Sequence, residues 1–221
     1  MTHHLSAGRL FFVVAALMAM FSLGACVDNG KAELEQSMNE YEDALRNKDG
    51  AKAIQYVAQG SFDHYSQVIQ YARTYTAEQV AQLSPYMQYH VLGVRAELKP
   101  EEVKTFDGRQ YMETSISRGY WIAGLGEGGV APKTTIKMYK GYATVDTEGM
   151  RKNSPPIRTY YLKDEASGRW QIDFSRDIAS MDQAIRDYAR LTRMSEREAV
   201  IEWVEEDIGA SLPATVWNPP K

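Results

Sequence analysis

Apolar residues recur at helical spacing along the chain from residue 34 onward. Leu34, Met38, Tyr41 and Leu45 follow one another at intervals of four, three and four residues, which places them on one face of a helix. Similar stripes, separated by residues that break helices, continue to about residue 117. We therefore predict further helices after Asp49, from Ser61 to Ala72, after Thr76, over 85–98, from Pro100 and over 109–117.

Polar residues in capping positions mark where several of these helices begin. Asp49 and Ser61 each precede an apolar run, and a side-chain oxygen in that position accepts a hydrogen bond from a free backbone N–H group. The segments Thr76–Gln79 and Ser195–Glu198 have the capping-box pattern. In Ser84-Pro85 the proline occupies the first helical position. These residues predict helix starts independently of the apolar stripes.

Residue types that favour strands gather after residue 132. Trp170, Ile172 and Phe174 alternate with polar residues, so one face of the last strand is predicted to be buried. Gly141 leaves open whether the first segment is one strand or a bent pair, and residues 164–168 form a hairpin connection. Strands are expected over residues 133–146, 157–163 and 169–175.

Two helices and a tail are predicted to close the chain. An apolar stripe from Ile178 to Ala189 indicates one helix, and a second helix ends at Gly209. The tail from Pro213 to Lys221 is expected to be extended, with Trp217 packed back on the body. Earlier in the chain, the run from Gly119 to Gly129 holds five glycines and is predicted to be a loop.

The N-terminal segment has the pattern of an export signal. Arg9 precedes sixteen uncharged residues, 10–25, and small residues come directly before Cys26. A basic start, an apolar core and a small-residue cleavage site are typical of a secretory signal. As a helix this stretch would rise roughly 24 Å, short of the ~30 Å hydrocarbon core. A cleaved signal is therefore favoured over a permanent membrane span.

The end of that segment, Leu23-Gly24-Ala25-Cys26, resembles the lipobox of bacterial lipoproteins. The resemblance implies that a diacylglycerol is attached to the thiol of Cys26, and that cleavage leaves this residue as the acylated N-terminus. Two or more acyl chains hold a protein firmly at a bilayer. Val27, in place of aspartate, favours the outer membrane in a bacterium that has one. An ordinary secretory signal and an uncleaved anchor are the alternatives.

We expect three parts: a signal peptide over residues 1–25, the lipidated cysteine and a tether over 26–31, and a single domain over 32–221. The whole chain has 25 Lys and Arg against 29 Asp and Glu. This mildly acidic balance argues against nucleic acid as a partner, since nucleic acid requires concentrated basic residues. With Cys26 acylated, no thiol remains for a thiol enzyme, an iron–sulfur cluster or a cysteine zinc site.

The order of elements is similar to that of the NTF2-like superfamily. The segment Tyr41 to Gly50 resembles the first helix and following turn of those domains, and Gly168 to Asp173 resembles their last strand. The resemblance implies an α+β cone with a curved antiparallel sheet of about three or four strands. Extra helices between residues 76 and 118 and a C-terminal helical pair depart from the compact form. The superfamily includes isomerases, dehydratases, transport factors and binding modules, so fold alone selects no function.

Asp173 is the one candidate for catalysis. It lies between Ile172 and Phe174 on the last strand, and in a cone-shaped pocket a carboxylate of raised pKa can act as a base. Tyr142 or Tyr160 would be its partner. The alternative is that Asp173 faces solvent or caps the following helix.

Other polar residues carry weaker signals. His64 and His90 each stand beside a tyrosine and are expected to be surface or hydrogen-bonded helical positions. The acidic run of Glu202, Glu205, Glu206 and Asp207 is expected to be a solvated helix face. The glycines of residues 124–129 follow no strand and predict a connection rather than a phosphate loop. We expect no cofactor and no metal.

These observations favour a membrane-anchored cell-envelope lipoprotein that is non-catalytic and binds a small apolar ligand or a protein partner. A structural subunit of an envelope assembly is the first alternative. An isomerase or hydrolase that uses Asp173 is the second. A wide exposed apolar patch on the helices of residues 85–118 or 178–208 would favour a protein partner.

Overall fold

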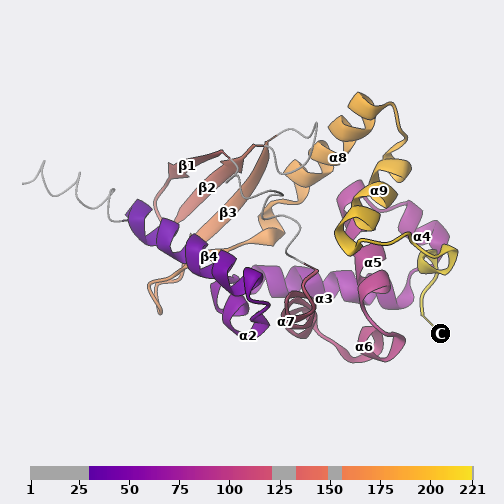
Figure 1. Cartoon of the computed structure of the whole chain (residues 1–221), viewed down its shortest axis with the longest axis horizontal. Coiled ribbons are helices and arrows are strands. Elements are labelled where there is room, and N and C mark those ends of the chain that lie inside the picture. Colours follow the sequence, from indigo (N-terminus) through magenta and orange to yellow (C-terminus); the bar gives the residue numbers. More distant parts are fainter. Residues whose placement is uncertain (1–29, 121–132, 149–155, 221) are drawn as a thin grey trace, which may run out of the picture.

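The computed structural model describes residues 30–120, 133–148 and 156–220, which form the mixed α+β fold expected from the sequence (Figure 1). The helices are residues 30–46, α2 (Gly50–Ala53), α3 (Gln59–Thr74), α4 (Ala77–Ala81), α5 (Pro85–Glu97), α6 (Pro100–Thr105), α7 (Gly108–Arg118), α8 (Ile178–Thr192) and α9 (Glu196–Ile208). Three 3-10 turns are η1 (Ile54–Tyr56), η4 (Phe174–Arg176) and η5 (Ala214–Trp217). The strands are β1 (Thr134–Met138), β2 (Tyr142–Thr147), β3 (Ile157–Lys163) and β4 (Trp170–Ile172).

The four strands form an antiparallel sheet in the order β1-β2-β3-β4. The segment around Gly141 is a pair of strands, since β1 and β2 pair as a hairpin and Gly141 has a positive φ of 80°. One face of the sheet packs against helix 30–46, where Leu34 and Tyr41 share the core with Val145. The backbone N–H of Trp170 also donates to Ser37 Oγ at 3.3 Å. Helix 30–46 thus covers the apolar face of the sheet.

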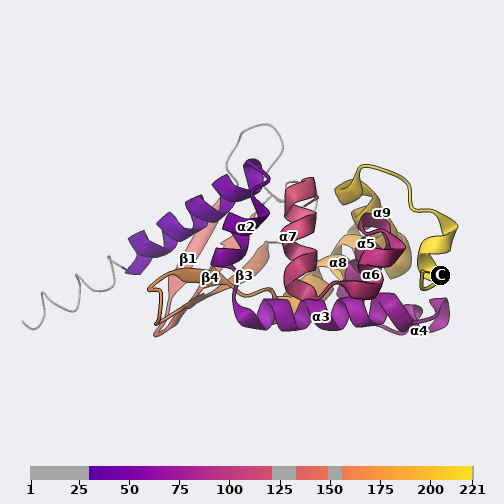
Figure 2. The same ribbon diagram turned by 90° about the horizontal axis from the view of Figure 1, so that it is seen from below.

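The sheet and helix 30–46 lie at one end of the molecule, and α4, α5, α6 and α9 lie at the other (Figure 2). Helix α3 runs from the sheet end into the helical end, while α7 and α8 lie between (Figures 1 and 2).

Close packing on α7 depends on two glycines. A Cβ at Gly108 would come within 2.1 Å of the Phe62 carbonyl oxygen, and one at Gly50 within 2.2 Å of the Glu113 carbonyl oxygen. Any side chain at either position would push the helices apart.

Most predicted helix starts are confirmed. The side chain of Asp49 accepts from the N–H of Lys52 at 3.0 Å, and both predicted capping boxes are present. The Ser61 cap is wrong, because α3 begins at Gln59 with no side-chain cap. Ser61 is instead buried, and its Oγ accepts from the N–H of Phe174 at 2.9 Å. A tertiary contact therefore uses the hydroxyl that the local pattern assigned to a cap.

Two expectations for the second half also need correction. The last strand ends at Ile172 rather than Ser175, because Asp173 caps the 3-10 turn η4 and directs Phe174 out of the strand. The tail is not fully extended, since residues 214–217 form η5. Its packing is confirmed: the Arg197 guanidinium lies 4.0 Å from the centre of the Trp217 ring. Most of the glycine-rich run, from residue 121, lies outside the described residues.

Arg95 fastens the tail to the helices. Its guanidinium donates to the carbonyls of Ala72 at 2.8 Å, Tyr75 at 2.6 Å and Trp217 at 2.7 Å. Burial lowers its pKa to about 10. One cation therefore satisfies carbonyls at the end of α3 and in the tail, which would otherwise lack partners.

Candidate functional site

Asp173 is buried, and the donors to its carboxylate belong to its own segment. Its carboxylate accepts from the backbone N–H of Ser175 at 3.1 Å, from Ser175 Oγ at 2.5 Å and from Arg176 Nε at 3.0 Å. Both oxygens thus have partners, and they stabilise the turn after β4. These contacts match the capping role that the sequence offered as the alternative to catalysis.

The two tyrosines proposed as partners of Asp173 lie elsewhere on the sheet. The Tyr142 ring stacks on Tyr139, with centroids 4.5 Å apart and planes 5° from parallel. Tyr160 is joined to Asp173 only through the backbone: its carbonyl accepts from the Asp173 N–H at 2.8 Å. Its side chain bonds to Arg158. The structure therefore brings neither ring to the Asp173 carboxylate.

His64 and His90 are brought together, in the core rather than on the surface. Each side chain is largely buried, and the two ring centroids lie 5.8 Å apart. His90 also packs edge-on against Tyr86 at 4.2 Å and Tyr65 at 5.0 Å. Burial lowers the pKa of both histidines, strongly for His90, whose charge is further opposed by His64. Both imidazoles are therefore neutral at pH 7. Of the two placements expected, at the surface or hydrogen-bonded in a helix, the surface placement is wrong.

Asp177 is a second buried acid in this interior. Only 3% of its surface is exposed, and among the described residues its Oδ1 has no hydrogen-bond partner. Burial raises the pKa of its carboxyl well above the usual range, and the nearby Asp173 raises it further. The hydroxyl of Tyr41 and the Nε2 atoms of His64 and His90 are also buried without partners in this part of the chain. Ordered water commonly satisfies such groups in proteins, so we interpret this interior as a polar core.

Glu97 is the centre of another set of polar contacts, at the helical end of the molecule. Its Oε2 accepts from Tyr111 Oη at 3.1 Å and from Ser115 Oγ at 2.9 Å. Burial raises the pKa of this carboxyl to about 7, despite those two hydrogen bonds, and the Asp207 charge adds to the effect. Asp207 itself accepts a short hydrogen bond from the Tyr89 hydroxyl. Two acids and two tyrosines thus tie α5, α7 and α9 together.

Three other acids of α9 border an open groove of about 250 Å³, which is lined by Met194, Glu198, Ile201, Glu202 and Glu205. Glu198 accepts from the N–H of Ser195 at 2.8 Å, and Glu205 accepts from the N–H of Leu212 at 2.8 Å. Glu202 Oε2 is buried without a hydrogen-bond partner in the described part of the chain. Trp203 is fully buried on the opposite side of the helix. The expected solvated face is therefore partly an apolar groove with acidic walls.

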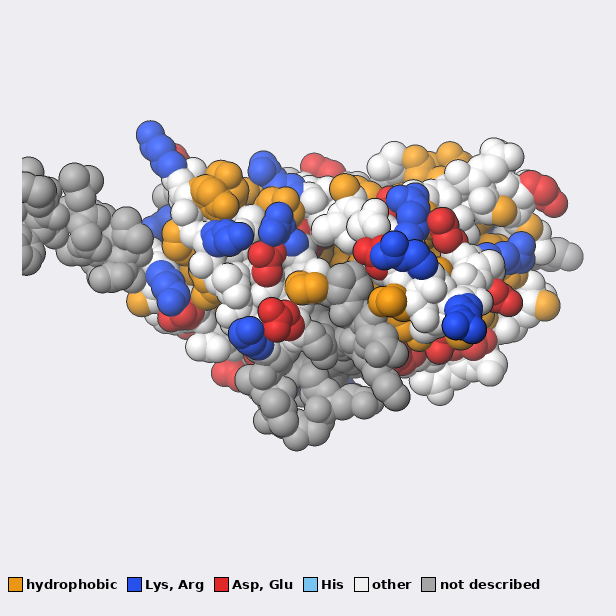
Figure 3. Space-filling view, turned by 90° about the horizontal axis from the view of Figure 1, so that it is seen from above, with side chains coloured by type: hydrophobic (Ala, Val, Ile, Leu, Met, Phe, Trp, Pro, Cys, Tyr) orange, Lys and Arg blue, Asp and Glu red, His pale blue; other side chains and the backbone are white. Residues whose placement is uncertain are grey.

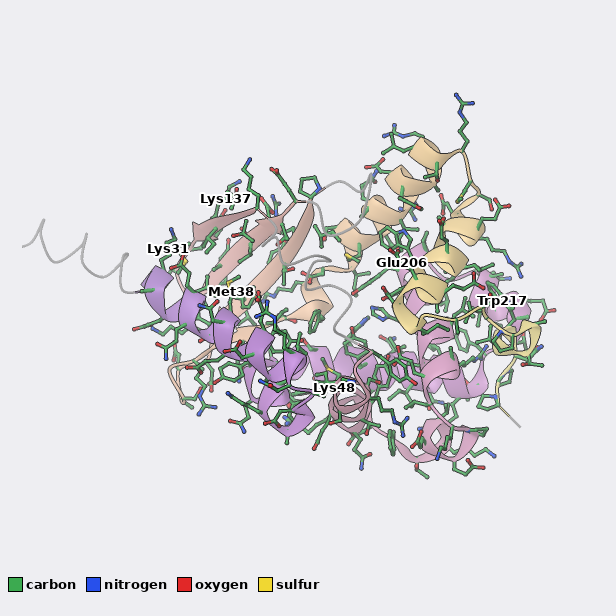
Figure 4. All side chains as sticks on the ribbon, in the orientation of Figure 1. Lys31, Met38, Lys48, Lys137, Glu206 and Trp217 are labelled. Carbon is green, nitrogen blue, oxygen red and sulfur yellow. The ribbon has the colours of Figure 1, made fainter. Side chains whose placement is uncertain are left out.

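Apolar side chains are exposed where α8 ends and in the turn that leads to α9. Leu191 is 61% exposed and Met194 is 38% exposed, and both are large. This turn lies in the region 178–208, where an apolar patch was expected to indicate a protein partner. The face lies far from the point where helix 30–46 begins (Figure 1). Lys31 and Lys137 mark the sheet end, while Glu206 and Trp217 mark the helical end (Figure 4).

The apolar and basic residues of this face were not predicted from the sequence. Leu191, Met194 and Ile201 did not stand out, because single exposed apolar residues are common. The sequence nevertheless contains a charge pattern that could have indicated this face. Arginines recur at positions 186, 190 and 193, and glutamates at 198, 202 and 205, so both sets have intervals of four and three residues. Basic and acidic side chains are mixed on the face that Figure 3 shows.

The described residues contain neither the predicted anchor nor a membrane-spanning helix or metal-binding group. Cys26 and the signal segment lie outside them. Within residues 30–120, 133–148 and 156–220, no helix is long and apolar enough to cross a membrane. In the same ranges, no group of three or more His, Cys, Asp or Glu residues is placed to hold a metal ion.

Comparison with known proteins gives no relative from which a role could be transferred. No family model, no curated protein and no solved structure matches the chain. The resemblance to the NTF2-like superfamily stays a prediction, and the case for function depends on the residues themselves.

Proposed function

We propose that this chain is a lipid-anchored protein of the bacterial cell envelope that docks a protein partner through the face formed by the α8–α9 turn and the adjoining groove. The lipobox-like segment ending at Cys26 supports the anchor. The mildly acidic charge supports a partner other than nucleic acid. In this role the protein is a binding module rather than an enzyme.

The observation that carries the proposal is the exposed Leu191, which precedes the groove-lining Met194 by three residues. Leu191 is 61% exposed and the nearby Met194 is 38% exposed, and large apolar side chains that are exposed together mark interaction sites. The groove provides an apolar floor from Met194 and Ile201. Polar walls around an apolar centre are typical of protein–protein interfaces.

The position of this face also suits a protein partner better than the membrane. An anchor at Cys26 would hold the start of helix 30–46 near the bilayer, since only a few residues separate them. The α8–α9 turn lies at the other end of the molecule (Figures 1 and 4). Its apolar side chains would therefore point away from the lipid surface. The proposed outer membrane location follows from Val27 and needs a double-membraned bacterium.

Photo-crosslinking in living cells tests this proposal. A photoreactive amino acid at position 191 should give discrete protein adducts in the membrane fraction. The same amino acid at Glu165, which is exposed at the sheet end, serves as the matched control. The proposal fails if position 191 gives no adduct, or if both positions give the same set of adducts.

A further inference from the structure

The α8–α9 face carries two charged stripes of opposite sign with the same spacing. Arg186, Arg190 and Arg193 are all exposed along α8 and its C-terminal end. Glu198, Glu202 and Glu205 line the groove on α9. Within each set the intervals are four and then three residues, and each set spans roughly 10 Å. The glutamates follow one face of α9, and Arg186 and Arg190 follow one face of α8, with Arg193 at the left-handed C-cap of that helix.

The described residues do not neutralise the charges of the acidic stripe. In the described residues, no ion pair joins Glu198, Glu202 or Glu205 to a lysine or arginine. The groove therefore presents three carboxylates around an apolar floor. Such a surface is complementary to a partner that brings basic residues at helical spacing beside an apolar side chain.

The arginine stripe is only loosely engaged. Arg186 pairs with Glu196 at 3.5 Å, and Arg190 pairs with Asp187 at 2.9 Å. The side chains of these arginines are 45% and 77% exposed, so solvent screens both pairs and donors remain available. Leu191 directly follows Arg190, which places an exposed apolar side chain beside the basic stripe.

We propose that the partner docked on this face is a second copy of the same chain, with the arginine stripe and Leu191 of each copy seated on the acidic groove of the other. This inference rests on the proposed docking function and names its partner. The face carries both halves of a complementary pair, which is the requirement for a two-fold interface in which each copy gives and receives the same contacts. When α8 of one copy lies along α9 of the other, the two middle residues, Arg190 and Glu202, stand opposite each other whether the helices run parallel or antiparallel.

The size of the face predicts an association that depends on the membrane. Helices α8 and α9 are each roughly 20 Å long, so together they present a face of roughly 400 Å². That is about half of the ~800 Å² per partner in a standard interface, and we expect weak pairing in free solution. Anchoring of both copies at Cys26 would confine them to one surface and raise their effective concentration. Their helical ends would then meet side by side, away from the bilayer.

Energy transfer between copies in liposomes tests this inference on the full acylated chain. A cysteine at Gln82, which is exposed at the helical end, gives one labelling position because Cys26 carries lipid. Copies labelled with donor and acceptor should transfer energy above the level calculated for random mixing at the same surface density. Arg190→Glu and Glu202→Arg should each weaken pairing at least tenfold, because each places like charges opposite one another.

The double variant Arg190→Glu/Glu202→Arg decides between self-pairing and another partner. Self-pairing predicts that the double variant regains transfer, since the swapped charges attract again. Leu191→Ser should lose transfer without any charge change, and Arg46→Glu, an exposed reversal on helix 30–46, should keep it. Random-level transfer in the wild type, or a double variant that stays unpaired, would overturn the inference. Adducts from position 191 to a different protein would in that case still support the docking function.

Discussion

The buried carboxyl of Glu97 allows a stability measurement with a defined size and sign. Its pKa rises from 4.5 to about 7 in the folded protein. In the unfolded chain the group ionises near its ordinary value, so the folded state holds a proton that the unfolded state has lost. Stability from this group is therefore present below about pH 4.5 and is lost as the pH rises through about 7. The full loss is at most about 3 kcal/mol, because one pKa unit corresponds to about 1.4 kcal/mol.

Glu97→Gln removes this ionisation and leaves an oxygen to accept from Tyr111 and Ser115. Urea denaturation of the wild type and the variant at pH 5, 6, 7 and 8 gives the free energy of unfolding of each. We expect the variant to be more stable than the wild type at pH 8 by about 1 to 3 kcal/mol, with little difference at pH 5. Taking the difference between the two proteins cancels the titration of His64 and His90, which they share.

A matched control excludes a general effect of removing one negative charge. Glu101→Gln lies on α6, where the side chain is exposed, and it should change stability by less than about 0.5 kcal/mol at every pH. The reasoning about Glu97 would be refuted by a Glu97→Gln variant that is equally destabilised at pH 5 and pH 8. That result would show that the carboxylate is stabilised where it lies, in spite of its burial.

Three further predictions concern the core. Arg95→Met should destabilise the protein by about 2 to 4 kcal/mol, because it leaves the carbonyls of Ala72 and Trp217 without this donor. Calorimetry on the variant checks this prediction, and an unchanged melting temperature would contradict it. Trp203→Ala should cost about 3 to 5 kcal/mol by opening a cavity under α9, and an unfolding free energy within 1 kcal/mol of the wild type would show that the site collapses instead. Burial lowers the pKa of His90, so the stability that its neutral form contributes is present above about pH 6.5 and is lost as the pH falls. His90→Phe should therefore reduce the loss of unfolding free energy between pH 6.5 and 5. An unchanged loss over that range would assign it to other groups.

The helices were predictable because their signals are local. The stripe from Leu34 to Leu45 and the capping boxes at Thr76 and Ser195 act within one or two turns. Ser61 was assigned wrongly because its hydroxyl bonds to Phe174, which is 113 residues away. Phe174 was assigned to a strand by alternation, and the cap formed by Asp173 ended that strand earlier. In both cases a tertiary contact used a group that short-range patterns place elsewhere.

The candidate site was less predictable than the fold. Burial of His64 and His90 depends on how α3 and α5 face each other, and neither helix has a sequence signal for that contact. The groove on α9 was likewise hidden, since its glutamates have the spacing of an ordinary solvated face. The matching intervals of Arg186, Arg190 and Arg193 were visible in the sequence. Only the structure shows that Leu191 is exposed next to Arg190 in the chain and that α9 carries a groove.

The account depends most on the anchor at Cys26, because the anchor gives both the location and the outward direction of the α8–α9 face. Mass spectrometry of the protein purified from its own membranes measures this directly. We predict an N-terminal peptide that begins at Cys26 and carries the mass of a diacylglycerol on its thiol. A natural protein that begins at another residue, or that has an unmodified Cys26, would contradict the account.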